Sequence, residues 1–228
     1  PQFGFLPLIT GTLWVSLFAI LIALPFGLAV AVYMSEVADH KIRNLMKPVI
    51  ELLSGIPSVV YGFFGLIVIV PLLQRVFDLP VGESGLAGSI VLAIMALPTI
   101  ITVTEDAMRN CPRAMREASL ALGASQWQTI YKVVIPYSIS GITSGVVLGI
   151  GRAVGETMAV IMVAGNQARM PIGLLEGVRT MTTNIVIEMG YAADLHRDAL
   201  IATAVVLFIF IMIINLTFSY LKGKVVQQ

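Results

Sequence analysis

Two charged side chains, Arg152 and Glu156, interrupt a long apolar stretch in the segment Gly-Arg-Ala-Val-Gly-Glu-Thr. A charge at the centre of a membrane helix costs about 2.5–3.5 kcal/mol on insertion scales, so such a residue usually faces a partner or a water-filled cavity. Four residues apart on one predicted helix, the two side chains share a face and can pair. One interpretation is therefore a buried ion pair that fixes helix packing.

The other interpretation is that Arg152 lines a pathway for an anion. Its guanidinium presents a planar fork of donors that matches an oxyanion, and Glu156 would hold or release that fork or shape the charge of the cavity. Buried ion pairs stabilise weakly, so an uncharged pair could have filled a purely structural role. The pattern predicts an anion as the ligand without naming it.

The composition places these charges in a membrane protein. The chain has 228 residues, of which 57% are hydrophobic and 12% are charged, about half the charged fraction of a soluble domain. This excludes a soluble enzyme and a disordered chain. The net charge of +1 leaves no basic excess for nucleic acid. A single cysteine, Cys111, excludes an intrachain disulfide framework and a cysteine-based zinc site, and we expect no metal site.

Charge-free runs long enough to cross a bilayer predict five transmembrane helices. They are expected at about 8–34, 50–73, 85–106, 138–165 and 199–221. The first run starts at Pro1 without a Met, a positive n-region or a cleavage site, so it does not resemble a signal peptide. We expect the sequence to be truncated there, with an earlier span missing.

The positions of Lys and Arg predict the orientation, because cytoplasmic loops are enriched in them. Nine of the 14 fall in the loops 36–49 and 107–137 and in the C-terminal tail, with Lys222 and Lys224 in the tail. Four fall on the other side, and Arg152 lies within a helix. The first side is therefore predicted to be cytoplasmic, which places the C-terminus inside and the visible N-terminus outside.

Proline and glycine residues suggest irregular, closely packed spans. Pro25, Pro57 and Pro98 fall inside the first three predicted helices, where a proline removes a backbone hydrogen bond and favours a kink. Such kinks are either gating features or simply tolerated. In the fourth helix a stripe of small residues repeats every four positions and predicts helix packing within the bundle. The stripe consists of Gly141, Gly145 and Gly149.

The predicted cytoplasmic loop 107–137 is too patterned for a plain connection. Good helix formers run from Arg113 to Leu122, and Gly123 fits a helix stop. Ser125 with Gln128 three residues on predicts a capping box that starts a second short helix, which Pro136 would end. The first helix carries an apolar stripe of Met115, Ala118 and Leu122. An ordinary amphipathic surface turn is the alternative.

This loop resembles the EAA motif of ABC importer permeases. The motif reads Glu-Ala-Ala, three residues, Gly, nine residues, then Ile-x-Leu-Pro. Glu117, Ala118, Gly123 and Pro136 match the motif, and Ser119, Val133 and Ile135 are conservative departures from it at the same spacing. The resemblance implies a type I importer permease bundle, in which this segment is a coupling helix that docks on an ATPase subunit. It assigns that coupling to Glu117 and Gly123 above all, together with Ala118, Ser119, Met115 and Leu122.

The sequence contains no G-x-x-x-x-G-K-[ST] loop, which is the phosphate-cradling element of an ATPase. We therefore expect no catalytic residue and no cofactor in this chain. ATP and Mg would be used by a partner ATPase.

Further segments resemble permeases of phosphate-specific importers, of the PstC type more than the PstA type, from about residue 4 to 222. They are Leu24–Leu28, Tyr33–Glu36, Gly55–Gly65 and Gly151–Asn166. The resemblance associates Arg152 and Glu156 with phosphate passage. It implies a PstA-like second permease, two copies of an ATPase and an extracytoplasmic phosphate-binding protein, in a bacterial or archaeal cytoplasmic membrane.

We expect one permease domain over residues 1–228. Its outer segment, about 166–198, is either a set of short helices that contact the binding protein or a solvated connection. Three alternatives stay open: a permease for another oxyanion such as sulfate or molybdate, a passive anion channel, and a membrane scaffold for signalling. Dependence on ATP would exclude the channel, and loss of flux on changing Arg152 would exclude the scaffold.

Overall fold

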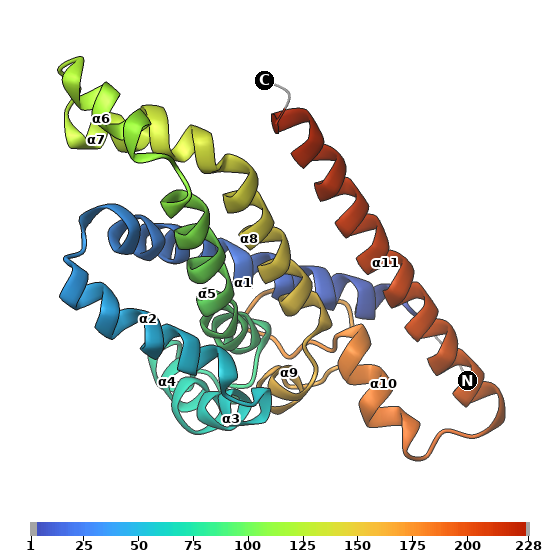
Figure 1. The fold of residues 1–228 in the computed structure, drawn as a ribbon. Coiled ribbons are helices and arrows are strands. Elements are labelled where there is room, and N and C mark those ends of the chain that lie inside the picture. Colours follow the sequence, from blue (N-terminus) through green and yellow to red (C-terminus); the bar gives the residue numbers. More distant parts are fainter. Residues whose placement is uncertain (1–3, 227–228) are drawn as a thin grey trace. The chain divides into compact units, whose positions relative to one another are not determined.

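The computed structural model describes residues 4–226, apart from the side chains of residues 218, 219 and 221–226. This part of the chain is helical and holds no β-strand, which confirms the all-α fold class (Figure 1). In chain order its elements are α1 (Leu6–Val32), the π-helical turn η1 (Tyr33–Val37), α2 (His40–Gly55), α3 (Ser58–Phe64), the π-helical turn η2 (Gly65–Ile69), α4 (Val70–Val76), α5 (Gly85–Arg109), α6 (Arg113–Ala121), α7 (Gln126–Thr129), the π-helical turn η3 (Ile130–Val134), α8 (Ile135–Gly155), α9 (Met158–Val163), α10 (Met181–Met189) and α11 (Asp194–Val226).

Five helical segments of the described residues are long and apolar enough to cross a membrane, as predicted. They cover Leu6–Val37, Ser58–Val76, Gly85–Arg109, Gln126–Gly155 and Asp194–Thr217. The chain is a multi-pass membrane protein. Lys222 and Lys224, used above for the orientation, lie outside the described side chains.

The prediction that the second span, 50–73, starts at about residue 50 is wrong. α2 ends at Gly55, and Pro57 precedes α3 with φ −58° and ψ 139°, which is not a helical conformation. A residue before proline is also disfavoured in the helical region, so Ile56 does not continue α2. The candidate span begins at Ser58, and α2 is a separate helix. Pro25 and Pro98 do lie inside helices, in α1 and α5.

The prediction that Pro136 ends a short helix is also wrong. α7 runs through η3 into α8 and forms one helical segment of 30 residues, Gln126–Gly155. Proline has no N–H to donate and its ring crowds the preceding turn. Immediately before it, the N–H of Ile135 bonds the carbonyl of Ile130 in a wider π-type turn. The wider turn accommodates the proline, so the helix continues.

The chain forms two compact units. Unit 1 comprises Pro1–Ile22, Ile56–Ala96 and Ile150–Asn215, and unit 2 comprises Ala23–Gly55, Leu97–Gly149 and Leu216–Gln228. In unit 1, α3 packs along α9 (Figure 1). The two backbones approach closely at Gly62, where a Cβ would lie 2.9 Å from the Cα of Ala159. Around this crossing lies an apolar core that includes Val91, Val160 and Val163.

In unit 2, α5 packs against α8 at the glycine stripe. A Cβ at Gly141 would overlap the Cβ of Ala107, and one at Gly145 would lie 3.2 Å from the Oγ1 of Thr104. Gly149 is buried as well.

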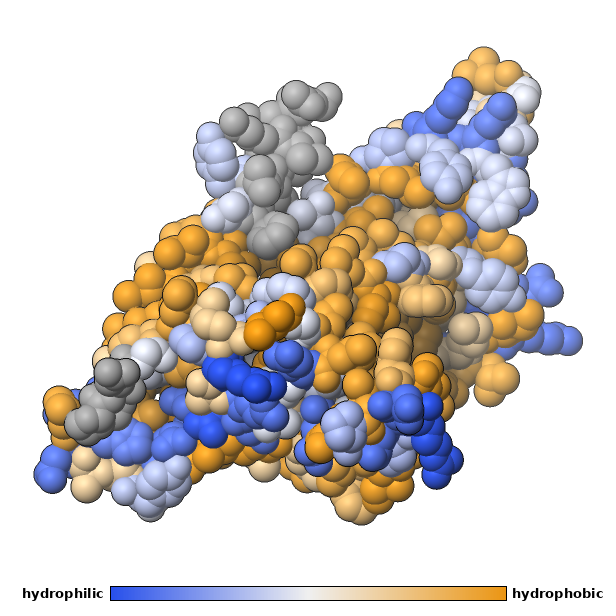
Figure 2. Space-filling view, turned by 180° about the vertical axis from the view of Figure 1, so that it is seen from behind, coloured by the Kyte–Doolittle hydropathy of each residue, from blue (hydrophilic) through white to orange (hydrophobic). Residues whose placement is uncertain are grey.

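Apolar side chains cover much of one face of the molecule (Figure 2). Four of the five candidate spans bury a third or less of their apolar window within the chain, and Gly85–Arg109 is the exception at 61%. α11 carries several exposed large hydrophobic residues, among them Phe208 and Leu216. Soluble proteins rarely expose so much continuous apolar surface. Such a surface is favourable where lipid or neighbouring membrane helices cover it.

Candidate functional site

The segment that holds Arg152 and Glu156 is a broken helix. α8 ends at Gly155 and α9 starts at Met158, so the prediction of one continuous helix over 138–165 is wrong. Arg152 lies in the last turn of α8, whereas Glu156 lies in the break. The residues the structure describes include no ion pair between the two, in contrast to the pairing expected from their spacing.

The carboxylate of Glu156 binds the backbone instead. Its Oε1 accepts the N–H of Thr157 at 3.1 Å and the N–H of Ala159 at 3.3 Å. The first N–H groups of a helix have no partner within it, and their partial positive charge favours an anion. Gly155, the last residue of α8, has no side chain that could accept these N–H groups. The side chain of Glu156 therefore stabilises the break.

Arg152 is half-buried at the end of α8 and lies close enough to Tyr61 for its charge to act on that side chain. Within the described part of the chain its guanidinium has no hydrogen bond and no ion pair, and nothing lies within 4 Å of a Cβ placed at Gly151 or Gly155. The neighbouring Ala153 and Val154 are buried, so one face of the end of α8 is packed while another is open. A guanidinium with unused donors binds oxyanions through charge-assisted, often bidentate hydrogen bonds.

The outer segment is folded rather than a plain connection. Thr180 and Thr183 form a capping box at the start of α10. The Oγ1 of Thr182 donates to the backbone carbonyl of Glu156 at 2.9 Å, and the N–H of Met181 donates to the Oγ1 of Thr12 at 3.0 Å. α10 is thereby attached to the helix break and to α1. Contact of this segment with a binding protein stays a prediction.

A polar cluster near the end of α10 was not predicted. The carboxylate of Glu188 accepts hydrogen bonds from the Nη1 of Arg179 at 2.7 Å and from the hydroxyl of Tyr191 at 2.5 Å. The Nε2 of His196 lies 3.5 Å from the Oε2 of Glu188. The hydrogen bond from Tyr191 holds the pKa of Glu188 below its ordinary value, and the hydrogen bond and charge of Arg179 and the charge of His196 act in the same direction, while burial opposes them. The same contact raises the pKa of Tyr191.

The segment 113–129, here called the α6–α7 unit, has the geometry predicted for it. α6 covers Arg113–Ala121, and Gly123 follows with φ +85°, a conformation that favours glycine. The N–H of Gly123 bonds the carbonyl of Leu120 at 2.9 Å, and Ser125 and Gln128 form the capping box. A hydrogen bond of 2.9 Å between the hydroxyls of Ser119 and Thr129 joins the two helices.

The residues assigned to coupling lie on the surface of this unit. Glu117 and Ala118 are exposed, and α6 buries none of its residues. Met115 is exposed, and Leu122 is 90% exposed. The apolar stripe therefore does not pack on its own chain, and it is free to contact another subunit.

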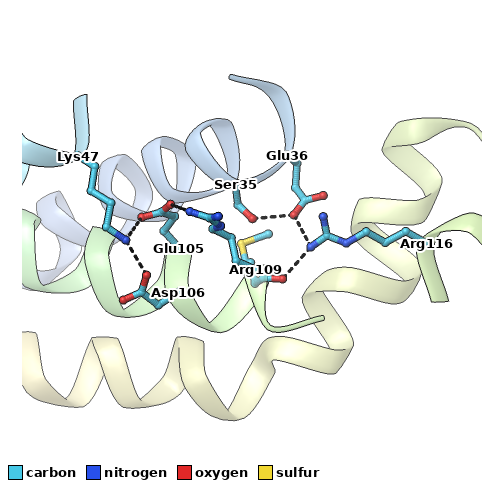
Figure 3. A network of polar contacts seen from close by, with 8 residues as sticks. Ser35, Glu36, Lys47, Glu105, Asp106, Arg109 and Arg116 are labelled. Atoms are coloured by element: carbon cyan, nitrogen blue, oxygen red, sulfur yellow. Dashed lines mark hydrogen bonds and ion pairs between the residues drawn. The ribbon is translucent and has the colours of Figure 1, made fainter. Parts of the chain in front are cut away.

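Two groups of ion pairs hold this end of unit 2 together, and neither was predicted (Figure 3). In the first, the Nη2 of Arg116 lies 3.0 Å from the Oε1 of Glu36 and donates to the carbonyl of Met108 at 2.8 Å. In the second, the Nζ of Lys47 lies 3.2 Å from Glu105 and 2.8 Å from Asp106.

The second group fixes α2 on α5. The side chain of Glu105 is only 1% exposed, and the Nη1 of Arg109 lies 3.4 Å from its Oε1. The hydrogen bond to Asp106 raises the pKa of Lys47, and Glu105 acts in the same direction while desolvation opposes both. Among the described residues, no group of three or more His, Cys, Asp and Glu side chains is placed to hold a metal ion.

Comparison with known proteins identifies the family. A family model described as "Binding-protein-dependent transport system inner membrane component" matches residues 23–227. A probable ABC transporter permease protein of Bacillus subtilis, YqgH, is 42% identical over 226 residues, which cover 98% of this chain and 73% of that protein. The phosphate transport system permease protein PstC of Mesorhizobium japonicum is 35% identical over 98% of this chain and 75% of its own length. PstC of Xylella fastidiosa is 37% identical, with coverage of 91% and 70%.

Among solved structures, a chain of the MetNI methionine ABC transporter in an inward-facing conformation superimposes with a TM-score of 0.71. It is 20% identical, and the match covers 97% of this chain and 94% of that one, a likeness of fold alone. The fold is that of a type I ABC importer permease. Members of the family work with a separate ATPase and a substrate-binding protein. The chain belongs to the family of binding-protein-dependent transport system inner membrane components, as a permease subunit of an ABC importer.

Proposed function

We propose that this permease imports phosphate across the cytoplasmic membrane. The observation that carries the proposal is the half-buried guanidinium of Arg152, which has no hydrogen bond and no ion pair among the described residues and lies beside an open face of α8. Relatives named as phosphate transport permeases support the choice of anion. YqgH, whose name gives no substrate, neither supports nor opposes it.

In this proposal the guanidinium of Arg152 donates hydrogen bonds to phosphate, and Glu156 holds the end of α8 that carries Arg152 in place. By accepting two N–H groups at the start of α9, Glu156 fixes where α8 ends. Its carboxylate is then bound to the backbone and does not neutralise the arginine. Phosphate would pair with Arg152 during passage and leave it without any covalent step, so the chain needs no nucleophile and no metal.

The chain would form half of the pathway, opposite a PstA-like second permease, on a dimer of ATPase subunits. An extracytoplasmic binding protein would deliver phosphate. ATP and Mg would act only in the ATPase, whose closure on ATP would displace the exposed face of α6 around Glu117. That movement would turn the pathway outward for loading, and hydrolysis would turn it inward for release. This assignment places α6 and the C-terminus in the cytoplasm.

The test is uptake of radiolabelled phosphate into vesicles that hold the complete complex. We expect ATP-dependent uptake that sulfate does not compete with. Arg152→Gln should lower it at least about tenfold, because a hydrogen bond to a charged group contributes about 1.5–3 kcal/mol. Arg75→Gln, at an exposed arginine of α4, is the matched control and should leave uptake unchanged.

Each other outcome selects a different function. Uptake without ATP would indicate a passive channel, and competition by sulfate would indicate a permease for another oxyanion. Full uptake by the Arg152→Gln complex would remove this residue from the pathway.

A further inference from the structure

The α6–α7 unit holds one residue of the first membrane helix from two sides. The Nη2 of Arg116, on α6, pairs with the carboxylate of Glu36 at 3.0 Å. The Nε2 of Gln126, on α7, donates to the backbone carbonyl of the same Glu36 at 3.1 Å. Figure 3 shows Arg116 reaching from α6 to Glu36. Glu36 belongs to η1, the π-helical turn that ends the first span.

The α6–α7 unit also reaches a second membrane helix directly, because α6 contacts η3 and α7 continues through η3 into α8. None of the residues of α6 is buried, and it is a polar contact that links α6 to the first span. The hydroxyl bond between Ser119 and Thr129 joins α6 to the start of the candidate span Gln126–Gly155 and not to the first span. Arg116 is different, because its Nη2 contacts η1 through Glu36 and the end of α5 through the carbonyl of Met108.

The environment of the contact makes it stiff. The side chain of Glu36 is 7% exposed, and its Oε1 also accepts the hydroxyl of Ser35 at 2.7 Å. A charge pair shielded from water is screened weakly by salt, and removing one partner leaves an uncompensated buried charge. Rigid contacts of this kind transmit displacement, whereas solvated ion pairs exchange partners with water.

We propose that Glu36 and Arg116 are positioning residues that transmit the displacement of the α6–α7 unit to the cytoplasmic end of the first membrane helix. This rests on the proposed docking of α6 on the ATPase. When the ATPase moves α6, the Arg116–Glu36 pair and the Gln126 bond pull η1 with it. Without the pair, ATP is hydrolysed while the first helix stays behind, and import is uncoupled.

The experiment uses the complete complex in proteoliposomes and two readouts. The first is the number of phosphate ions imported per ATP hydrolysed. The second is the labelling rate of a cysteine at Val37, an exposed residue of η1, with and without a non-hydrolysable ATP analogue and with Cys111 replaced by Ala. The second readout needs no transported substrate.

We expect Glu36→Met, Arg116→Met and the double variant each to lower the import ratio at least about tenfold and to weaken the nucleotide effect at Val37, where only the Gln126 bond remains, while the ATPase stays bound. The double variant leaves no unpaired buried charge, so it separates loss of the link from loss of folding. Matched controls remove exposed charges of α2, in Lys41→Gln and Glu51→Gln, and should behave as the wild type.

A wild-type ratio in the double variant would overturn the proposal, because the singles would then act only through an unpaired charge. Loss of ATPase binding in all three variants would also overturn it, in favour of a purely structural contact. A wild-type complex that shows the nucleotide effect at Val37 but imports no phosphate would contradict the proposed substrate and leave this link intact.

Discussion

Glu188 is the residue whose ionisation depends most visibly on its neighbours. Tyr191 and Arg179 donate to its carboxylate, and the pKa of Glu188 is lowered first by the Tyr191 hydrogen bond. A carboxyl group whose pKa is lower in the folded state stabilises the fold above its unfolded-state pKa. That contribution is lost as the pH falls through the folded-state value.

We therefore expect the Tyr191→Phe variant to lose stability at a higher pH than the wild type on acidification, because the pKa of Glu188 returns towards its ordinary value. Glu188→Gln should remove this part of the pH dependence. The measurement is the melting temperature of the purified complex in detergent across the acidic range. Identical acid profiles for wild type and Tyr191→Phe would show that the hydroxyl does not hold the carboxylate in its ionised form.

At the scale of single residues, the sequence predicts the candidate site residues better than it predicts their interaction partners. Arg152 and Glu156 stand out because each is a charge in an apolar stretch, yet their spacing suggests a pair that the described structure does not contain. The backbone N–H groups of Thr157 and Ala159 compete for the carboxylate, and a side-chain pattern does not reveal that competition. Glu36 and Arg116 are 80 positions apart, so only the fold brings them together.

Among the elements, the crossing of α5 and α8 depends on the absence of a side chain at Gly141. A Cβ there would overlap the Cβ of Ala107, which cannot rotate away, so the two helices would have to separate. We expect Gly141→Ala to destabilise the protein by about 1–3 kcal/mol, as overpacking does. Thermal unfolding in detergent measures the effect.

Two further variants make this prediction specific. Gly151→Ala, in the same helix, meets nothing within 4 Å and should stabilise by up to about 1 kcal/mol, since alanine favours a helix. Adding Ala107→Gly to Gly141→Ala removes the overlapping methyl group and should restore part of the loss. If Gly141→Ala and Gly151→Ala proved equally stable, the glycine stripe would have no packing role.

Elements that depend on local sequence signals are predicted accurately, whereas elements that depend on more than local signals are not. The α6–α7 unit was predicted nearly to the residue, because the helix stop at Gly123 and the capping box at Ser125 are local interactions. Pro57 and Pro136 look alike in sequence, yet one precedes a new helix and the other lies within one. The difference is η3, whose widened turn accommodates Pro136, and no local sequence signal predicted it.

For the whole molecule, hydropathy predicts the five candidate spans found among the described residues, because every apolar run of sufficient length must leave water. It does not predict the tertiary contacts among η1, α2, α5 and α6 that hold one end of unit 2 together. Lys47 contributes to the positive charge of a predicted loop, but in the structure it binds Glu105 and Asp106 on α5.

The orientation of the molecule is a prediction that two exposed positions can test. Leu122, between α6 and α7, is 90% exposed, and Ile172, in the outer segment, is 85% exposed. One candidate span, Gln126–Gly155, separates them, so they should lie on opposite sides of the membrane. The enrichment of Lys and Arg around α6 predicts that Leu122 is inside.

In cells that express the complete complex, a membrane-impermeant maleimide should label Ile172→Cys directly and Leu122→Cys only after the membrane is opened. Replacing Cys111, which is buried, by Ala removes the background. Labelling of Leu122→Cys in intact cells would place Glu117 outside, where ATP and the ATPase are absent, and would contradict the coupling role of α6. Labelling of both positions before the membrane is opened would instead mean that Gln126–Gly155 does not cross it.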